Sequence, residues 1–200
     1  MFFSAVQCSH ILVFGDLKNS VKFVLTGLKF SNDMSKQSEL QSYEYPKSAS
    51  KLLKCMAPEI LEQNIIGSSF KSDIYSVGLA CCELANGIAP FGDMQPDQLL
   101  FYKIIGETPR PLDSTCEEMK IIREYTDKME ITLQKRYAHY LKRSFSDDFH
   151  HFVSNACLHN EQSRRFTASE LLEHLFMQKS LKEYSSSKMQ LLAKHLQSPV

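Results

Sequence analysis

Residues 72–87 decide the fold, and they read Ser-Asp-Ile-Tyr-Ser-Val-Gly-Leu-Ala-Cys-Cys-Glu-Leu-Ala-Asn-Gly. We predict that Ser72 caps a helix beginning at Asp73 and that Asn86-Gly87 ends it. The apolar residues of this helix point around most of its circumference; they are Ile74, Val77, Leu79, Ala80, Cys81 and Leu84. A helix that is apolar on nearly all sides belongs at the centre of a domain. We therefore expect the other helices to pack around it.

Three further segments are predicted to form helices around this centre. Acids follow Ser146 in the first turn of one of them, and apolar residues then recur at helical spacing up to Cys157. Thr167 and Glu170 form a capping box for the last helix. The apolar face behind this box consists of Leu171, Leu172, Leu175 and Phe176. Residues 117–142 predict one charged amphipathic helix, whose weaker apolar side covers the chain's own core or, as a second interpretation, binds a partner.

The amino end predicts a small β-hairpin. Ile11–Phe14 and Val21–Leu25 are short runs of β-branched and aromatic residues, with turn residues between them at 15–20. Residues 31–50 are rich in serine and lack sustained periodicity, which predicts a long surface loop. A plain solvated loop and a loop that is phosphorylated on serine or tyrosine are equally open interpretations. The chain is thus predicted to be mainly α with one minor hairpin.

Charge and composition argue against several classes of function. The 23 lysine and arginine residues balance the 23 aspartate and glutamate residues, so the formal net charge is zero. This balance argues against a nucleic-acid binder held by phosphate contacts. No stretch approaches the ~20 apolar residues of a membrane span, and the amino end lacks the basic region of a signal peptide. None of the six cysteines forms a C-x-x-C pair, so we interpret the thiols as small core residues of a reduced protein. We expect a soluble protein of the cytoplasm, present also in the nucleus, that binds no nucleic acid and no membrane.

Four short sequence strings occur along the chain, and both their residues and their order are informative. They are Ala57-Pro58-Glu59, then residues 73–78, then residues 83–91 with Asn86-Gly87 and Pro90, and finally residues 165–174. The series resembles the A-P-E, D-x-W-S-x-G and closing R-P-T-A segments of eukaryotic protein kinases. One triplet alone is uninformative, but four in order over about half the chain are specific. The resemblance implies the carboxy-terminal lobe of a protein kinase, with the amino-terminal lobe absent.

Other strings are similar to one kinase-like family, the Sterile-20-related adaptor (STRAD) pseudokinases. Residues 6–12 look like its altered catalytic loop, residues 26–29 like its replacement for D-F-G, and residues 143–153 like its later helix. The chain departs from that family in its charged segment at 113–142, where the family is usually Ser/Pro-rich, and in lacking the family's W-E-F terminus.

By this resemblance we divide the chain into two parts. Residues 1–178 form a truncated kinase-like domain, which includes an activation-segment-like loop at 31–58 and an insert helix at 113–142. Residues 179–200 form a carboxy-terminal tail.

The resemblance also implies scaffold roles for three residues. Glu59 and Arg165 would form a buried ion pair joining the activation segment to the helical core. Asp73 would accept backbone N–H groups from the catalytic loop. Neither role involves chemistry on a substrate.

The positions that carry phosphoryl transfer in kinases are degenerate here. Placing His10 at the asparagine position of the catalytic-loop template puts Ala5 where the base should be and Gln7 where the lysine should be. A methyl group cannot accept a proton. The D-F-G aspartate falls at Gly27 or, one register earlier, at Thr26, and neither supplies a carboxylate for magnesium. We therefore predict that the chain is not an enzyme.

We also predict that no metal ion and no nucleotide cofactor bind. No two of the seven glycines are separated by a single residue, so the chain has no G-x-G loop, and no G-x-x-x-x-G-K appears. The resemblance implies that ATP binding would require the amino-terminal lobe. We interpret His10 as a loop residue and not a metal ligand, and His150 and His151 as packing residues.

The resemblance implies an allosteric adaptor. Such a pseudokinase would bind and activate a serine/threonine kinase of the liver kinase B type, helped by a helical-repeat scaffold protein. Two alternatives remain open. One is a kinase with displaced catalytic groups and residual ATP binding, for which Asp33 is the nearest downstream acid. The other is a truncated product with no function of its own.

Overall fold

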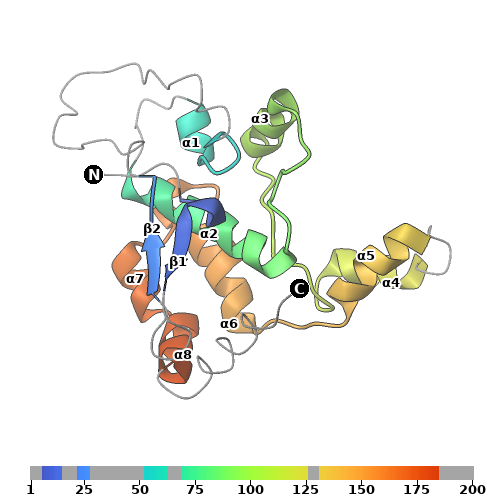
Figure 1. Ribbon diagram of the computed structural model, residues 1–200. Coiled ribbons are helices and arrows are strands. Elements are labelled where there is room, and N and C mark those ends of the chain that lie inside the picture. Colours follow the sequence, from blue (N-terminus) through green and yellow to red (C-terminus); the bar gives the residue numbers. More distant parts are fainter. Residues whose placement is uncertain (1–5, 15–21, 28–51, 63–68, 126–130, 185–200) are drawn as a thin grey trace.

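A computed structural model of the chain describes residues 6–14, 22–27, 52–62, 69–125 and 131–184 (Figure 1). Its strands are β1 (Ile11–Phe14) and β2 (Lys22–Leu25). Its α-helices are α1 (Pro58–Leu61), α2 (Phe70–Asn86), α3 (Pro96–Ile104), α4 (Glu117–Tyr125), α5 (Ile131–Leu141), α6 (Asp147–His150), α7 (Ala168–Glu173) and α8 (Leu175–Tyr184). Two 3-10 turns, η1 (Cys8–His10) and η7 (Gln162–Arg164), and a π-helix, η6 (His151–Cys157), complete the order. The prediction of a mainly α fold with one hairpin is confirmed.

Helix α2 forms the centre of the core, as the sequence predicts. Its main partner is η6, and the buried residues shared by the two helices and their neighbours are Ala57, Ile74, Tyr75, Leu79, Cys82, Phe152, Val153, Ala156, Cys157, Leu158 and Leu171. Gly78 permits this close packing, because a Cβ built there would lie 2.7 Å from Cγ of Leu158. Gly87 ends the helix with a φ of 72°, a left-handed conformation that glycine adopts without steric cost.

The start of α2 differs from the prediction. Ser69, and not Ser72, is the N-cap: its hydroxyl accepts from the backbone N–H of Lys71. Ser72 is the third helical residue, and its hydroxyl oxygen accepts from the backbone N–H of Ser69. The predicted cap is wrong because Ser72 lies inside the helix, where its hydroxyl donates to the Glu59 carboxylate at 2.7 Å.

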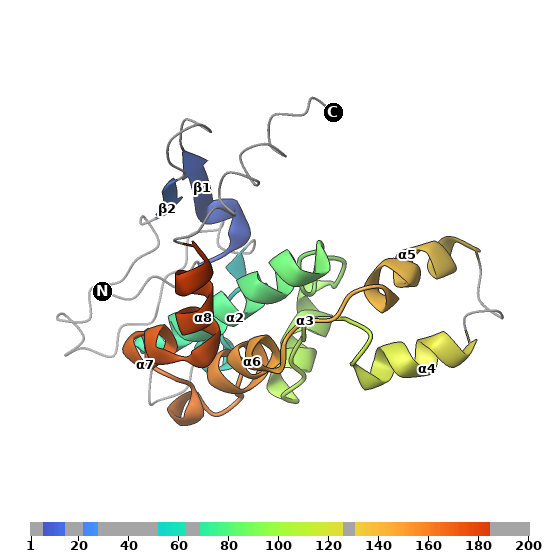
Figure 2. The same ribbon diagram turned by 90° about the horizontal axis from the view of Figure 1, so that it is seen from below.

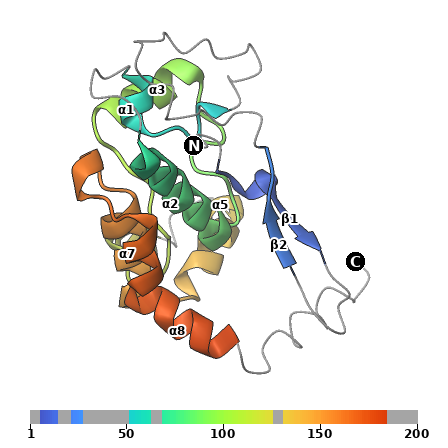
Figure 3. The same cartoon turned by 90° about the vertical axis from the view of Figure 1, so that its left-hand side faces the viewer.

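The amino-terminal hairpin is confirmed. Strands β1 and β2 pair antiparallel, with Ile11 opposite Leu25 and Phe14 opposite Lys22. The predicted turn at 15–20 lies outside the described residues. Figure 3 shows the hairpin to one side of α2, away from α7.

The segment predicted as one helix at 117–142 forms two helices. Helices α4 and α5 lie side by side and project from the rest of the molecule (Figure 2). They bury Cys116, Met119 and Tyr140 between them. A single straight helix is wrong because the apolar sides of its two halves satisfy each other only when the chain folds back. These apolar residues form a cluster of their own, separate from the core around α2, so the expectation that they cover that core is wrong.

The base of this insert is tied to the end of α2. The side-chain oxygen of Asn86 accepts from the backbone N–H of Leu112 at 2.8 Å and from Nη2 of Arg143 at 3.3 Å. Nε of Arg143 donates to the Leu112 carbonyl at 2.9 Å. The Tyr140 hydroxyl donates to the Asn86 carbonyl. A network of polar contacts at the carboxy-terminal end of α2, around Asn86, therefore attaches the insert to the core.

The carboxy-terminal helices follow the predicted start but not the predicted face. Ser146 caps α6, and Thr167 and Glu170 form the capping box of α7, as predicted. The backbone then leaves the helical conformation at His174, so α7 and α8 are separate helices. Leu171 is buried, whereas Leu172 and Leu175 are exposed. The predicted continuous face is wrong because Leu172 points about 100° away from Leu171 around α7, and the break at His174 separates Leu175 from that helix.

Two further facts complete the description. Within the described ranges, no helix is both long enough and apolar enough to cross a membrane. All six cysteines are free, and Cys55, Cys82, Cys116 and Cys157 are buried, which agrees with their interpretation as core residues. Helix α8 continues through the division predicted at residue 178.

Candidate functional site

Of the residues predicted to stand at degenerate catalytic positions, Gln7, His10 and Gly27 are described, and they lie close together. Turn η1 leads directly into β1, and Nε2 of Gln7 lies 2.9 Å from Nε2 of His10. The backbone N–H and the hydroxyl of Thr26 both donate to the His10 carbonyl, at 2.7 and 3.0 Å. Gly27 has a φ of 87°, and a Cβ there would lie 2.9 Å from Nδ1 of His10. The His10 ring therefore covers Gly27, which with Thr26 is one of the two residues predicted for the D-F-G position.

The side chains of Gln7, His10 and Thr26 contribute an amide, an imidazole and a hydroxyl to this cluster, and the carboxylate nearby is that of Glu83, beside Cys8 of the same turn. Ala5 and Asp33 lie outside the described residues. Within the described part of the chain, no three His, Cys, Asp or Glu side chains are grouped so that they could hold a metal ion. The Cys8 thiol donates to the Ala80 carbonyl at 3.4 Å, which attaches the turn to α2. Burial, and then the nearby Glu83, raises the pKa of this thiol to about 12, so it stays protonated and is a poor nucleophile.

The structure brings Glu59 and Arg165 together in a buried pair. Nη1 of Arg165 donates to Oε1 of Glu59 at 2.7 Å, and Nη2 donates to Oε2 at 2.9 Å. Both residues are buried, at 8% and 1% exposed. Glu59 belongs to α1 and Arg165 to the segment before α7, so the pair joins the end of the activation-segment-like loop to the helical core. Two parallel bonds to one carboxylate are the strongest form of such a contact.

Other groups complete the surroundings of this pair. The Arg165 guanidinium also donates to the carbonyls of His159, Lys71 and Asn160, and it lies 4.9 Å from the centre of the Tyr75 ring. Burial alone raises the pKa of the Glu59 carboxyl, but the hydrogen bonds and charge of Arg165 outweigh burial and lower it below its ordinary value. Glu59 therefore stays ionised, and its role is structural.

Asp73 lies half-buried in the first turn of α2. The interaction predicted for it, with the backbone of the catalytic loop, stays a prediction.

Lys103 forms a second buried cationic site, which sequence reasoning missed. It extends from α3 and is 1% exposed. Its ammonium donates to the carbonyls of Leu53, Lys54 and Met56. All three acceptors are backbone groups of an irregular segment, so no side-chain pattern could have revealed them. The sequence signal in this region concerned the helix that carries Lys103 and not the lysine itself: proline occupies the first position of α3, and Asp97 follows it.

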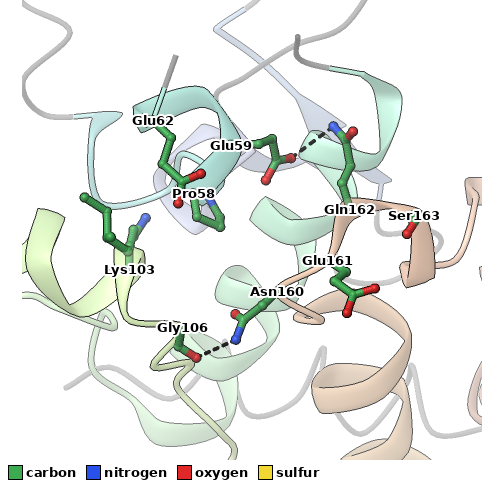
Figure 4. Close-up of a pocket in the computed structure, with 10 residues that line it drawn as sticks. Pro58, Glu59, Glu62, Lys103, Gly106, Asn160, Glu161, Gln162 and Ser163 are labelled. Atoms are coloured by element: carbon green, nitrogen blue, oxygen red, sulfur yellow. Dashed lines mark hydrogen bonds between the residues drawn. The ribbon is translucent and has the colours of Figure 1, made fainter. Parts of the chain in front are cut away.

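Two clefts flank this lysine. One, of about 360 Å³, lies between α1, α3 and residues 159–163, and Figure 4 shows Glu62, Lys103 and Glu161 around it. The Asn160 amide donates to the Gly106 carbonyl at 2.7 Å across its lower edge. The other cleft, of about 330 Å³, is mainly apolar; it is lined by Leu53, Leu61, Pro96, Asp97, Leu99 and Leu100.

A third buried charge, Asp113, lies at the base of the insert and was also missed. It accepts from the backbone N–H of Phe145 at 2.6 Å and from the N–H and hydroxyl of Thr115 at 2.9 and 2.6 Å. Nε2 of His150 lies 2.9 Å from its second oxygen. Burial alone raises the pKa of this carboxyl, but these donors outweigh burial and hold it far below its ordinary value. The site joins the insert to α6, and it accounts for the packing role predicted for His150.

The geometry therefore consists of buried structural charges around a helical core, beside an amino-terminal turn whose described residues, 6–10, carry no carboxyl side chain of their own. Residues 17–177 match the family described as the protein kinase domain. Because this match covers more than half of the chain, the chain belongs to the protein kinase domain family.

Within that family, the chain is similar to STE20-related kinase adapter proteins, which confirms the predicted resemblance. It is 35% identical over 205 residues to STE20-related kinase adapter protein alpha of Homo sapiens, covering 94% of this chain and 46% of that one. It is 35% identical over 162 residues to STE20-related kinase adapter protein strd-1 of Caenorhabditis elegans, covering 81% and 39%. Identity to STE20-related kinase adapter protein beta of Homo sapiens is 31% over 206 residues, covering 94% and 48%. The chain spans about half the length of these relatives or less.

Among solved structures, the twitchin kinase region from C. elegans superposes with a TM-score of 0.44 at 19% identity, over 64% of this chain and 17% of that one. This likeness is too loose to support an inference.

Proposed function

We propose that the chain is a catalytically inactive adaptor, which binds a serine/threonine kinase of the liver kinase B type and stabilises its active form together with a helical-repeat scaffold protein. The observation that carries the proposal is the similarity to STE20-related kinase adapter proteins along 94% of the chain. Such an adaptor acts only by binding the active conformation of its partner more tightly than the inactive one. A tenfold shift of that equilibrium requires about 1.4 kcal/mol of difference.

The chemistry of the amino-terminal turn supports the inactive part of this proposal. Phosphoryl transfer needs a base at the attacking hydroxyl and ligands for magnesium. Gln7, His10 and Gly27 place an amide, an imidazole and a bare backbone in the cluster where these groups would stand. Loss of general-base catalysis alone lowers a rate by roughly 10²–10⁴-fold. We therefore expect no phosphate transfer by the chain itself.

Helix α3 and residues 52–61 supply the contact surface that we propose for the partner kinase. Helix α3 exposes Leu100, Phe101, Tyr102 and Ile104 around much of its circumference, and Leu100 also lines the apolar cleft. Apolar side chains gathered on an exposed face are typical of protein–protein contacts. We expect apolar side chains of the partner kinase to occupy this cleft.

A capture experiment with two matched variants tests the proposal. The chain is immobilised and incubated with the purified partner kinase, and bound kinase is measured for phosphate transfer to a peptide. Phe101→Ser removes an apolar ring that is 61% exposed on α3, whereas Phe23→Ser removes one that is 58% exposed on the hairpin. We expect the first variant to lose captured kinase and the second to retain it. Absence of capture by the unaltered chain would defeat the proposal.

The rival function, a kinase with displaced catalytic groups, is separated by a second assay. The chain alone is incubated with radiolabelled ATP, magnesium and a protein substrate. Transfer that disappears in Asp33→Ala would favour the rival. We expect a signal no greater than that of the heat-denatured chain.

A further inference from the structure

The ammonium of Lys103 hydrogen-bonds most of the carbonyls of one backbone segment, residues 53–56. It has three N–H donors, and they meet three carbonyls, those of Leu53, Lys54 and Met56. The remaining carbonyl of this run, that of Cys55, accepts from the Ser76 hydroxyl at 2.7 Å. Side chains from α2 and α3 therefore satisfy every carbonyl from 53 to 56, although the segment forms no regular helix or strand.

The position of this ammonium is closely defined. Its nitrogen lies 5.5 Å from the centre of the Tyr75 ring and 5.4 Å from that of the Phe91 ring, so an aromatic face from each of two elements accompanies the charge. Burial lowers the pKa of Lys103 to about 7, because removal from water disfavours the charged form. The Lys103 ammonium is buried in spite of this cost, and each of its three N–H groups has a carbonyl acceptor. It therefore holds those three carbonyls in one arrangement.

The segment it holds borders the proposed partner surface. Leu53 contributes a carbonyl to Lys103 and also lines the apolar cleft together with Leu99 and Leu100 of α3. Without the ammonium, three buried carbonyls would lose their partner, and the segment would have to rearrange to reach water. A partner would then have to order the segment on binding, which weakens affinity.

We propose that Lys103 is a positioning residue, whose ammonium fixes residues 53–56 in the shape that the partner kinase contacts. This inference rests on the proposed function. Lys103 itself is buried and does not touch the partner; it acts through the backbone that it binds.

Two measurements on the full chain test the inference. Lys103→Met keeps the length of the side chain and removes its charge and donors, and Lys103→Gln keeps two N–H donors in case the methionine variant does not fold. Val153→Ala is the matched control, because it opens a cavity in the core shared by α2 and η6 and leaves the four side-chain hydrogen bonds to the carbonyls of residues 53–56 in place. Amide hydrogen exchange reports the order of residues 52–57, and surface plasmon resonance reports the affinity for the partner kinase.

We expect Lys103→Met to speed exchange at 52–57 at least tenfold and to weaken partner binding at least tenfold, with smaller effects for Lys103→Gln. Val153→Ala, at an equal or larger loss of melting temperature, should change both quantities less than twofold. Unchanged exchange at 52–57, or unchanged affinity in a Lys103 variant while the unaltered chain binds, would overturn the inference. If the unaltered chain does not bind the partner, the proposed function is wrong, and this inference is wrong with it.

Discussion

Arg165 and Glu59, which are 106 residues apart in sequence, meet through two parallel hydrogen bonds of 2.7 and 2.9 Å in the buried core. This pair is the link between α1 and the carboxy-terminal helices. Because both groups are removed from water, each depends on the other for its stability in the folded state.

Removing one partner of this pair should be severely destabilising. We expect Arg165→Met to lower the free energy of unfolding by roughly 3–5 kcal/mol, because it leaves the Glu59 carboxylate buried and unpaired. The double variant Glu59→Gln/Arg165→Met should lose less than the sum of the two single changes, since it buries no lone charge. Urea unfolding followed by circular dichroism measures all three. Additive losses would show that the two side chains do not depend on each other.

A second prediction concerns the insert. Asp113→Asn replaces a carboxylate that has five hydrogen-bond partners, the Cys116 thiol included, with a group that can accept fewer, so we expect a loss of about 1.5–3 kcal/mol and faster exchange in α4 and α5. The pKa of Asp113 is lower in the folded state than its ordinary value. Its stabilisation is therefore present above about pH 4 and is lost as the pH falls further.

Hydrogen exchange by mass spectrometry measures this opening of the insert. Asp97→Asn, on the surface at the start of α3, is the control and should leave exchange in α4 and α5 unchanged. Protection of α4 and α5 that is the same in Asp113→Asn and in the unaltered chain would count against this role.

The part of the fold that could be predicted is the part encoded by local pattern. Helix α2 was predictable because apolar residues cover its circumference and Gly87 ends it, and α7 was predictable from the Thr167–Glu170 box. The Glu59–Arg165 contact followed only from the kinase resemblance, because nothing local links residues so far apart. The Ser69 cap was missed because two serines fit the local rule, and only the contact between Ser72 and Glu59 decides between them.

The buried charges at Lys103 and Asp113 could not be predicted for a different reason. The hydrogen-bond acceptors of Lys103 are backbone carbonyls, which are the same whatever the side chains are. Asp113 combines backbone N–H groups with side chains, among them His150, which is 37 residues away in sequence. The folding of 117–142 into two helices depends on Met119 and Tyr140 meeting across the hairpin, which a periodicity within either half does not reveal.

A third prediction follows from two stacked histidines. The backbone N–H of Phe176 donates to Nδ1 of His174, so the proton of the neutral His174 ring is on Nε2, which lies 2.9 Å from Nδ1 of His151. A proton added to His151 would place its Nδ1–H against the Nε2–H of His174. A proton added to His174 would place its Nδ1–H against the Phe176 N–H. Asp148, which pairs with Lys179, is the charged neighbour on α6.

The sign of the pH effect follows from this geometry. Burial, and then the proximity of His151, lowers the pKa of His174 in the folded state. The unfolded chain therefore binds this proton first, and the free energy of unfolding falls as the pH drops below about 6.5. NMR titration of the ring protons should show the pKa of His174 rising in His151→Phe, while His139→Gln leaves it unaltered. A pKa that is the same in all three proteins would contradict the interaction.

A fourth prediction uses Lys103 as a pH probe. The folded pKa of Lys103 is about 7, and that of an unfolded lysine is about 10.4. Between these values the unfolded chain carries the extra proton, so the free energy of unfolding should rise with pH, by up to about 1.4 kcal/mol per unit.

Urea unfolding between pH 7.0 and 8.3 measures the Lys103 contribution as the excess slope of the unaltered chain over Lys103→Met, because the thiols of the unfolded chain begin to ionise in this range and contribute equally to both proteins. Lys120→Met, a change at an exposed lysine of α4, should keep that excess. Equal slopes in the three proteins would show that the burial of Lys103 does not affect its ionisation.

The central claim is that the chain works by binding a kinase and not by transferring phosphate. The most direct test titrates the chain into a fixed amount of the partner kinase and measures the rate at which the partner phosphorylates a peptide. We predict a saturable rise of at least tenfold, equivalent to about 1.4 kcal/mol of preference for the active form, with no transfer by the chain alone. A partner rate that stays flat at saturating chain, or phosphate transfer by the chain in the absence of the partner, would contradict it.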